Sequence, residues 1–382
     1  MPATALLGLQ WGDEGKGKIV DLLAGDAHYV VRFNGGDNAG HAVKVDGRRF
    51  GLQLVPSSIF HRNAVKVIAP GTVVNPQTLL DEVDALAEAG LRVDNLMVSD
   101  RAHLVLPWHL REDRRRDFRT MRKGIGPAYA DKAARFRAIR AGDLRGRTLA
   151  ARVREIAAKR FDVDAIVTVL RRFARRFDIQ DTTRLLNGAL DRGRHVLLEG
   201  AQGTMLDIDH GTYPFVTASS TVAGGACTGA GLAPKSITRV VGVVKAYVTR
   251  VGAGPFPTEA SASDADLLRK RGLEFGSATG QLRRCGWLDL VALKLAIRLN
   301  RPDELAMTKL DVVALLPRVP VCVAYRIGRR RVDEFPLDAA GVKPVYEEVR
   351  PTALAEFVER RLKTHVGILS FGADRNDTIR RR

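Results

Sequence analysis

The sequence predicts an α/β fold: a single domain over residues 1–382, with a central, mostly parallel sheet and helices on both of its faces. Two observations predict this fold. Apolar runs of strand length alternate along the chain with segments of helical spacing, and several of these runs stop in loops rich in glycine. In such folds ligands bind in the loops at the strand carboxyl ends, so we expect the functional residues there.

Size and charge narrow the choice of partners. The chain has 382 residues, 45% of them hydrophobic, which is enough to bury a large core. Its formal net charge of +18 favours nucleic acid, polyanionic small substrates, or simply an arginine-rich composition. Basic and acidic residues are interleaved and only 6% of residues are aromatic, so the stacking pattern of single-strand binders is missing. We expect small-molecule partners and no nucleic acid.

The cysteines and the apolar segments indicate a compartment. Cys227, Cys285 and Cys322 are far apart and odd in number, which is typical of a reducing environment. The N-terminal apolar stretch is too short for a signal peptide, and no later segment approaches membrane-spanning length. We therefore expect a cytoplasmic protein with no membrane partner.

The first loop is the feature around which the site is predicted. An apolar run over residues 5–9 leads into the sequence Trp-Gly-Asp-Glu-Gly-Lys-Gly-Lys at residues 11–18, and Ile19 begins a helical pattern. Backbone N–H groups in such a loop converge on phosphate oxygens, and Lys16 and Lys18 add full positive charges. A glycine-rich turn with solvated charges is the alternative. The pattern favours a phosphate-bearing ligand.

The same loop differs from the common phosphate loop at one position. Gly12 to Lys18 fits the spacing G-x-x-x-x-G-K, but Ile19 stands where a Ser or Thr hydroxyl usually binds magnesium. Another oxygen must then hold the ion, and Asp13 is the candidate.

A second polar loop follows the next predicted strand, residues 28–33. It runs over residues 34–42, contains three glycines and ends near His41. Glycine loops after two early strands predict neighbouring edges of one site. A lone histidine more often packs or faces solvent, but the place of His41 between two such loops favours a function.

The remaining elements follow in order. We predict helices over residues 79–89, 149–177 with a break near Phe161, 287–299 and 352–363, and strands over 196–198, 240–247 and near 305–306. Residues 321–327 and 330–335 look like a hairpin, and the basic stretch 111–123 ends in a predicted mobile loop at 124–129. Small-residue loops that follow strands are predicted at 199–204, 207–225, 249–258 and 370–375.

The segment Thr308-Lys309-Leu310-Asp311 adds a base reader. It resembles the Lys-x-Asp element of guanine-nucleotide proteins, whose carboxylate accepts hydrogen bonds from guanine N1–H and the 2-amino group. Together with a phosphate loop at the other end of the chain, it favours GTP.

Long motifs in order across nearly the whole chain resemble those of the adenylosuccinate synthetase family. Beyond the loop at residues 10–18, the matching segments are 38–41, 124–129, 199–203, 207–214, 249–259, 286–289 and 308–311. The resemblance implies a GTP- and Mg²⁺-dependent ligase that joins IMP to L-aspartate and releases GDP and phosphate. It also implies a homodimer.

The resemblance also implies roles for individual residues. Asp13 would remove the N1 proton of IMP so that O6 attacks the γ-phosphorus, and would hold Mg²⁺ together with the Gly40 carbonyl. His41 would stabilise the transferring oxygens as an acid. The aspartate amine then displaces phosphate from C6 of the 6-phosphoryl intermediate.

The implied binding residues form three groups. GTP would contact Gly12, Asp13, Glu14, Gly15, Lys16, Gly17, Lys18, Gly40, His41, Ala42, Arg283, Lys309, Asp311, Ser370, Phe371 and Gly372. The substrate nucleotide would contact Asn38, Met121, Gln202, Thr217, Val251 and, from the neighbouring subunit, Arg135. The amino acid would contact Thr279, Gln281 and Arg283.

Departures from the family pattern lie mainly on the acceptor and amino-acid sides. Met121 stands where the family has a phosphate-binding threonine, although Thr120 or Arg122 could donate instead. Gln281 and Leu282 replace two arginines, and losing a charged hydrogen bond to a carboxylate costs about 1.5 to 3 kcal/mol. Ala42 and Ala373 are smaller changes on the GTP side.

These departures leave alternatives open. One is a related synthetase that acts on a guanylate such as dGMP, or that uses another amine donor. A second, of a different class, is a GTP-binding regulator without ligase activity. The presence of both Asp13 and His41 argues for catalysis.

Overall fold

One large sheet forms the centre of the molecule. The computed structural model describes residues 3–115, 121–157, 160–275 and 282–381 of the chain. Within them the strand order is β20-β19-β15-β11-β1-β10-β2-β5-β7-β9, and every neighbouring pair is parallel except β19 with β20. The sheet consists of β1 (Ala3–Gly8), β2 (Tyr29–Arg32), β5 (Val65–Ile68), β7 (Leu96–Ser99), β9 (Asp178–Gln180), β10 (Val196–Glu199), β11 (Ile237–Lys245), β15 (Glu304–Thr308), β19 (Val366–Ser370) and β20 (Thr378–Arg380). The predicted α/β class and mostly parallel sheet are confirmed.

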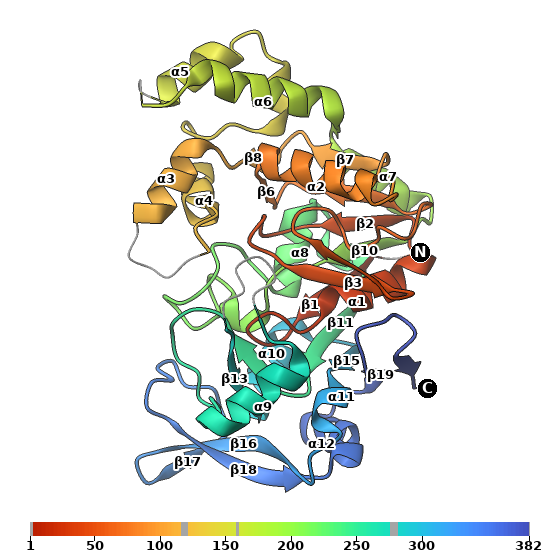
Figure 1. Cartoon of the computed structure of the whole chain (residues 1–382), viewed down its shortest axis with the longest axis vertical. Coiled ribbons are helices and arrows are strands. Elements are labelled where there is room, and N and C mark those ends of the chain that lie inside the picture. Colours follow the sequence, from red (N-terminus) through yellow and green to blue (C-terminus); the bar gives the residue numbers. More distant parts are fainter. Residues whose placement is uncertain (1–2, 116–120, 158–159, 276–281, 382) are drawn as a thin grey trace.

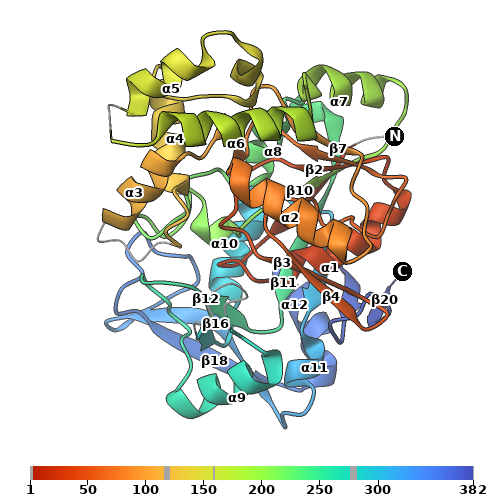
Figure 2. The same cartoon turned by 45° about the horizontal axis from the view of Figure 1, so that its top comes forward.

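Helices cover both faces of this sheet (Figure 1). They are α1 (Lys16–Leu23), α2 (Pro76–Glu88), α3 (Pro107–Arg115), α4 (Ile125–Ala134), α5 (Leu149–Ala157), α6 (Val163–Arg176), α7 (Thr182–Asp191), α8 (Ala223–Ala230), α9 (Ala262–Gly272), α10 (Leu290–Asn300), α11 (Leu310–Val313) and α12 (Leu354–Leu362). Figure 2 shows α6 and α2 on the side of the molecule away from α9, α11 and α12.

Alternation along β1 explains why both faces need cover. Ala5 and Leu7 belong to an apolar cluster shared with α7 and α8, whereas Leu6 packs with Ile19 and Val20 of α1. All six residues of β1 are buried. A strand enclosed on both faces reads as a continuous apolar run, which is the pattern that predicted it.

Three short strand pairs in the described part of the chain lie outside the central sheet. β3 (His41–Val45) and β4 (Arg48–Leu52) form a hairpin, β6 (Val73–Val74) pairs with β8 (His103–Leu104), and β12 (Val248–Arg250) pairs with β13 (Arg284–Gly286). A second small sheet at the lower end of Figure 1 contains β14 (Leu288–Asp289), β16 (Val319–Ile327), β17 (Arg330–Val332) and β18 (Lys343–Val349). The predicted hairpin is β16 with β17.

Three predicted elements need comment. The break predicted near Phe161 is confirmed, because α5 ends at Ala157 and α6 begins at Val163. The helix predicted from residue 287 begins at Leu290, since residues 288–289 form β14 and Asp289 caps the helix. The mobile loop predicted at 124–129 is wrong: Gly124 is the N-cap of α4, and its N–H donates to Asp113 Oδ2 at 2.8 Å.

Candidate active site

The loop between β1 and α1 has the backbone of an anion-binding loop. Gly12 and Gly15 have φ of 86° and 85°, and Asp13 has φ of 59°. A non-glycine residue in the left-handed region is strained, and such strain gathers at functional sites. The loop thereby projects the Asp13 carboxylate at the carboxyl end of β1, where it keeps 22% side-chain exposure.

Glu14 lies beneath this loop rather than facing outward. Its side chain is fully buried and accepts hydrogen bonds from the N–H groups of Gln10 and Gly12 at 3.1 and 2.9 Å. Lys16 donates to the other oxygen at 2.6 Å. Because its carboxylate is already engaged, Glu14 can make the predicted GTP contact only through its backbone. The carboxylate stabilises the loop through these hydrogen bonds.

Lys18 points to the C-terminal loop. Its ammonium donates to Ser370 Oγ at 2.8 Å, to the Gly372 carbonyl at 2.9 Å and to the Asp377 carbonyl at 3.0 Å. Burial lowers the pKa of Lys18 to about 8, against the opposing charge of Asp377. Lys18 thus ties the start of α1 to the segment predicted to close over guanine.

Gly17 brings the second loop against the first. A Cβ at position 17 would lie 2.9 Å from the Ala42 carbonyl oxygen and 3.1 Å from His41 Cβ, so only glycine permits this approach. The start of β3, with His41 and Ala42, therefore packs on the first turn of α1. The segment that carries Asp13 and the segment that carries His41 therefore pack against each other.

His41 is held by a buried carboxylate. Its Nδ1 bonds Glu199 Oε1, and Glu199 also accepts from Ser57 Oγ at 2.6 Å and Ser57 N at 2.8 Å. Burial lowers the pKa of His41 despite the carboxylate. Burial would raise the pKa of Glu199, but hydrogen bonds from His41 and Ser57 and the charge of Arg32 lower it. A neutral imidazole that donates from Nδ1 leaves Nε2 for a ligand.

Asp13 has an arginine partner. Arg283 Nε lies 2.8 Å from Asp13 Oδ2, and Arg283 Nη1 donates to Glu274 Oε2 at 2.7 Å. Although it is close to Asp13, the buried Nε–H has no acceptor with hydrogen-bond geometry among the described residues. The contact is an ion pair that leaves this donor available.

The proposed guanine reader follows β15. Lys309 has φ of 61° and donates to the Gly272 carbonyl at 2.7 Å, and Asp311 lies exposed in the first turn of α11. Thr308 Oγ1 donates to the Glu14 carbonyl at 2.6 Å, so this strand end touches the phosphate loop. Phe371, in the C-terminal loop, is 42% exposed.

Two of the predicted nucleotide-substrate residues, Asn38 and Gln202, are in contact. Gln202 Nε2 donates to Asn38 Oδ1 at 3.1 Å, and the Cα of Gln202 would lie 3.8 Å from a Cβ at Gly12. Gln202 Oε1 and Thr217 Oγ1 are buried without a hydrogen-bond partner in the described part of the chain. Buried polar atoms are nearly always satisfied, so these two are suited to a polar ligand.

Several predicted residues lie at the surface or outside the described ranges. Met121 and Val251 are 41% and 44% exposed. Arg135 is exposed with φ of 71°, beside Phe136, which is 84% exposed. Thr279 and Gln281 lie outside the described residues.

The donor atoms fit a magnesium ion that keeps substrate ligands. No group of three or more His, Cys, Asp or Glu side chains within the described ranges could hold a metal alone. A partly exposed carboxylate at Asp13 and a backbone carbonyl at Gly40 are hard oxygen donors, and Mg²⁺ at nucleotide sites commonly takes few protein ligands and several phosphate or water oxygens.

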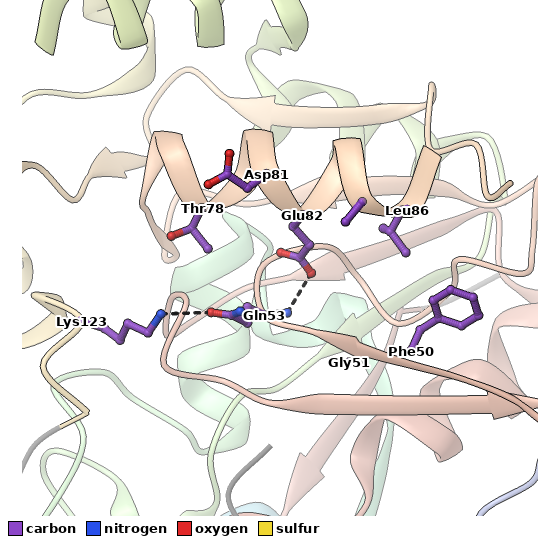
Figure 3. A pocket seen from close by; sticks show the side chains of 9 residues that line it. Phe50, Gly51, Gln53, Thr78, Asp81, Glu82, Leu86 and Lys123 are labelled. Carbon is purple, nitrogen blue, oxygen red and sulfur yellow. Dashed lines mark hydrogen bonds between the residues drawn. The ribbon is translucent and has the colours of Figure 1, made fainter. Parts of the chain in front are cut away.

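A cavity of about 450 Å³ lies beside this edge, between β4 and α2 (Figure 3). Its wall consists of Phe50, Gly51, Gln53, Thr78, Asp81, Glu82, Ala85, Leu86 and Lys123. None of the predicted site residues lines it. Glu82 accepts from the N–H groups of Gln53 and Leu54 at 2.8 and 2.9 Å, so it anchors the end of the β3–β4 hairpin.

The fold and this edge are those of a nucleotide-binding α/β enzyme: a glycine-rich loop with a strained carboxylate leads into a helix whose first turn packs against a buried histidine. A family model described as adenylosuccinate synthetase matches residues 5–354. The chain belongs to the adenylosuccinate synthetase family. It is therefore a GTP-dependent ligase that forms a carbon–nitrogen bond, as the sequence predicted.

Adenylosuccinate synthetases from other organisms match the chain over nearly the full length of both proteins. The chain is 46% identical over 419 aligned residues to the adenylosuccinate synthetase of Wolinella succinogenes, covering 100% of both chains. It is 47% identical to that of Sorangium cellulosum, covering 100% of this chain and 99% of the relative. These matches favour the family reaction over the guanylate-acceptor alternative.

Solved structures agree on the fold. The fully ligated adenylosuccinate synthetase of Plasmodium falciparum has a TM-score of 0.93 at 32% identity, covering 100% of both chains. A cyanophage S-2L succinoaminodeoxyadenylate synthetase bound to dGMP and dATP has a TM-score of 0.71 at 22% identity, covering 99% of this chain and 95% of that one. The second match bears on the fold alone.

The helices carry no membrane signal: along the described residues, none is both long and apolar enough to cross a bilayer.

Sequence reasoning missed the residues behind the site. Glu199 was noted only as part of a loop, and Arg32, its register neighbour on β2, was not singled out. Arg32 is fully buried, yet its Nε and Nη2 lack partners among the described residues. A charged residue that ends an otherwise apolar strand was the available signal in both cases.

Proposed function

We propose that this edge of the sheet is the active site, and that it joins IMP to L-aspartate with the roles predicted for Asp13 and His41. Asp13 takes the N1 proton of IMP, and the electrons move to O6, which attacks the γ-phosphorus of GTP as the bond to GDP breaks. The aspartate amine then adds at C6, phosphate leaves with the C6–O6 bond, and the amine proton is lost. The product is adenylosuccinate.

One observation carries the proposal: the glycine-rich segment that holds a strained carboxylate packs against the start of β3, which holds a carboxylate-bound histidine. The loop supplies amides for phosphate, and Asp13 keeps enough exposure to meet a base. Phosphate beside His41 Nε2 adds negative charge, which favours protonation of the imidazole. Protonated His41 then donates to the transferring oxygens, with Glu199 balancing its charge.

The binding groups are assigned as the resemblance implies. Residues 12–18 with 40–42 cradle the GTP phosphates, and Lys309, Asp311 and residues 370–372 hold guanine. Asn38, Gln202, Thr217, Val251 and Met121 face the IMP side, while Thr279, Gln281 and Arg283 take the amino acid. The unpaired oxygens of Gln202 and Thr217 support the IMP assignment.

Magnesium belongs to the proposal too. Asp13 and the Gly40 carbonyl would hold it, and when bound it neutralises charge on the phosphate oxygens.

Assembly and location complete the proposal. The whole chain, residues 1–382, acts as one catalytic unit, and two copies form a homodimer in which Arg135 reaches the neighbouring site. Exposure of Phe136 next to Arg135 supports an interface there. All three cysteines are free, which suits the cytoplasm.

Substrate choice is tested by direct comparison. The protein is incubated with GTP, Mg²⁺ and L-aspartate, and either IMP or dGMP is offered while phosphate release and succinyl-purine absorbance are followed. We expect product from IMP. Turnover of dGMP alone would contradict the acceptor assignment, and GTP hydrolysis without condensation would favour the regulator.

The base is tested by Asp13→Asn. We expect product formation to fall by about 10²- to 10⁴-fold, because general base catalysis contributes that range. Binding of a fluorescent GTP analogue should remain measurable, since the backbone amides of the loop are unchanged. Activity that survives this change would refute the assignment of Asp13.

A further inference from the structure

Behind Asp13 lies a buried network of charged groups. Lys245 and Glu274 are 0% and 1% exposed. Glu274 Oε1 accepts from Lys245 Nζ at 2.9 Å and from Tyr247 Oη at 2.5 Å, and its Oε2 accepts from Arg283 Nη1 at 2.7 Å. Arg283 in turn pairs with Asp13. Contacts thus run without a break from the interior to the proposed base.

Glu274 is ionised at the centre of this network. Burial would raise the pKa of Glu274, but the charges of Lys245, Lys309 and Arg283 outweigh burial and hold this pKa at about 2. Buried ion pairs contribute little net stability relative to an apolar cluster of the same shape. Stability therefore does not explain why these charged groups are buried. Because the network ends at Asp13, we look for its role in the function of that residue.

The backbone fixes Glu274 from both sides. α9 ends at Gly272, where a Cβ would lie 2.1 Å from the Tyr247 hydroxyl, so the helix end packs directly on Tyr247. Glu274 N donates to the Arg269 carbonyl at 3.0 Å, and Arg283 N donates to the Glu274 carbonyl at 3.2 Å. Glu274 and Arg283 are thus coupled through both backbone and side chain.

One buried nitrogen of Arg283, Nε, has no hydrogen-bond acceptor among the described residues. Glu274 engages Nη1, and Asp13 lies near Nε without hydrogen-bond alignment. A guanidinium held at one end cannot rotate to improve its contact at the other, because the group is planar and rigid. The Nε–H is therefore positioned for an oxygen that a substrate brings, beside the carboxylate that acts on that substrate.

We infer that Glu274, fixed by Lys245 and Tyr247, is a positioning residue that sets Arg283 against Asp13. In this position the Arg283 Nε–H, which has no aligned acceptor among the described residues, is presented to a substrate oxygen. Glu274 touches no substrate itself. The inference rests on the proposed role of Asp13, so the wild-type reaction with IMP is measured first, and its failure would count against that role rather than against Glu274.

The test is Glu274→Gln, which keeps size and removes charge. We expect kcat to fall about 10- to 100-fold, the usual cost of a lost supporting contact and a misplaced reacting group. The dissociation constant for GTP should change by a smaller factor than kcat, because the phosphate loop is untouched and Arg283 is one of many predicted GTP contacts. Glu274→Asp keeps the charge with a shorter reach and should retain more activity than Glu274→Gln.

A matched control lies on α9, the helix that precedes Glu274. Asp266→Asn removes an exposed ion pair with Lys270 on α9, at 2.8 Å, and should leave kcat and thermal unfolding unchanged. A kcat for Glu274→Gln within twofold of wild type would overturn the inference. So would a loss of rate matched by an equal loss of GTP affinity.

A second variant keeps the test open if Glu274→Gln does not fold. Tyr247→Phe removes one donor to Glu274 while every charge remains. We expect kcat to fall about 3- to 10-fold, since one hydrogen bond is worth about 1 kcal/mol. Wild-type kcat in folded Tyr247→Phe protein would count against the inference.

Discussion

At the scale of single residues, the site is defined by what holds each catalytic group. The sequence identified Asp13 and His41 because they stand in glycine-rich loops after strands. It did not identify Arg283 as the partner of Asp13 or Glu199 as the partner of His41, because both partners come from distant parts of the chain. Pairings of this kind depend on strand order, which local sequence patterns do not report.

Glu199 offers a direct test at this scale. Glu199→Gln keeps an acceptor for His41 Nδ1 but removes the charge that balances a protonated imidazole. We expect kcat to fall about 10- to 100-fold, and further as pH rises, because the imidazole then loses its proton more easily. Steady-state kinetics between pH 6 and pH 9 measure this.

Ser57→Ala serves as the graded comparison for Glu199. It removes one donor to the carboxylate at 2.6 Å and leaves the charge in place. A smaller loss of kcat is expected, without the added pH dependence. Equal pH profiles for Glu199→Gln and wild type would contradict the proposed charge balance.

At the scale of elements, the regular pattern was predictable and the exceptions have local causes. Apolar runs predicted the strands β1, β2, β10, β11 and β15, and helical spacing predicted the break between α5 and α6, whereas β5, β7 and β9 were not predicted. α4 was missed because Gly124 and Pro127 resemble a loop, whereas they are the cap and an early helical position of a helix. The β3–β4 hairpin, which carries His41, has exposed polar residues and gives little periodic signal.

Glu82 makes the anchoring of this hairpin testable. Burial raises the pKa of Glu82 to about 7, even though Leu54 and Gln53 N–H groups bond it. The folded protein therefore holds this proton to a higher pH than the unfolded chain, whose glutamates titrate near 4.5. Protonated Glu82 therefore contributes its full stabilisation below pH 4.5, and this contribution is lost as the pH rises toward 7.

We expect Glu82→Gln to flatten this pH dependence. The free energy of unfolding of the wild type should fall by on the order of 2 kcal/mol more than that of the variant between pH 5 and pH 8. Urea denaturation at both pH values measures the difference. Asp81→Asn, at the neighbouring exposed position, is the control. Parallel pH profiles for wild type and Glu82→Gln would contradict the assignment.

At the scale of the whole molecule, the order of strands makes one site from distant segments. β1 lies between β10 and β11, so loops at residues 9–15, 199–204 and 308–311 converge although they are far apart in sequence. The sequence predicted that glycine loops would meet at one edge, because parallel strands share their carboxyl ends. Which loops touch follows only from the strand order.

The proposed homodimer extends this reasoning to a second copy. If Arg135 completes the partner's site, each active site takes Asp13 from one subunit and Arg135 from the other. Asp13→Asn and Arg135→Leu then remove groups that different subunits contribute to a site. Each variant alone should be nearly inactive. Mixed as equal amounts of exchanging subunits, half of the dimers are hybrids, and each hybrid has one site with both residues intact. Activity should therefore return to about a quarter of the wild-type value.

Recovery of activity in the mixture distinguishes a site shared between subunits from a contact of Arg135 that only stabilises its own subunit. An arginine that acts within its own subunit cannot be replaced by a partner, so the mixture would stay as inactive as its components. Sedimentation of each variant shows whether dimers form, and incubation time controls exchange. Recovery that rises with exchange would establish Arg135 as a residue of the neighbouring site, because no other arrangement restores an intact pair from two damaged chains.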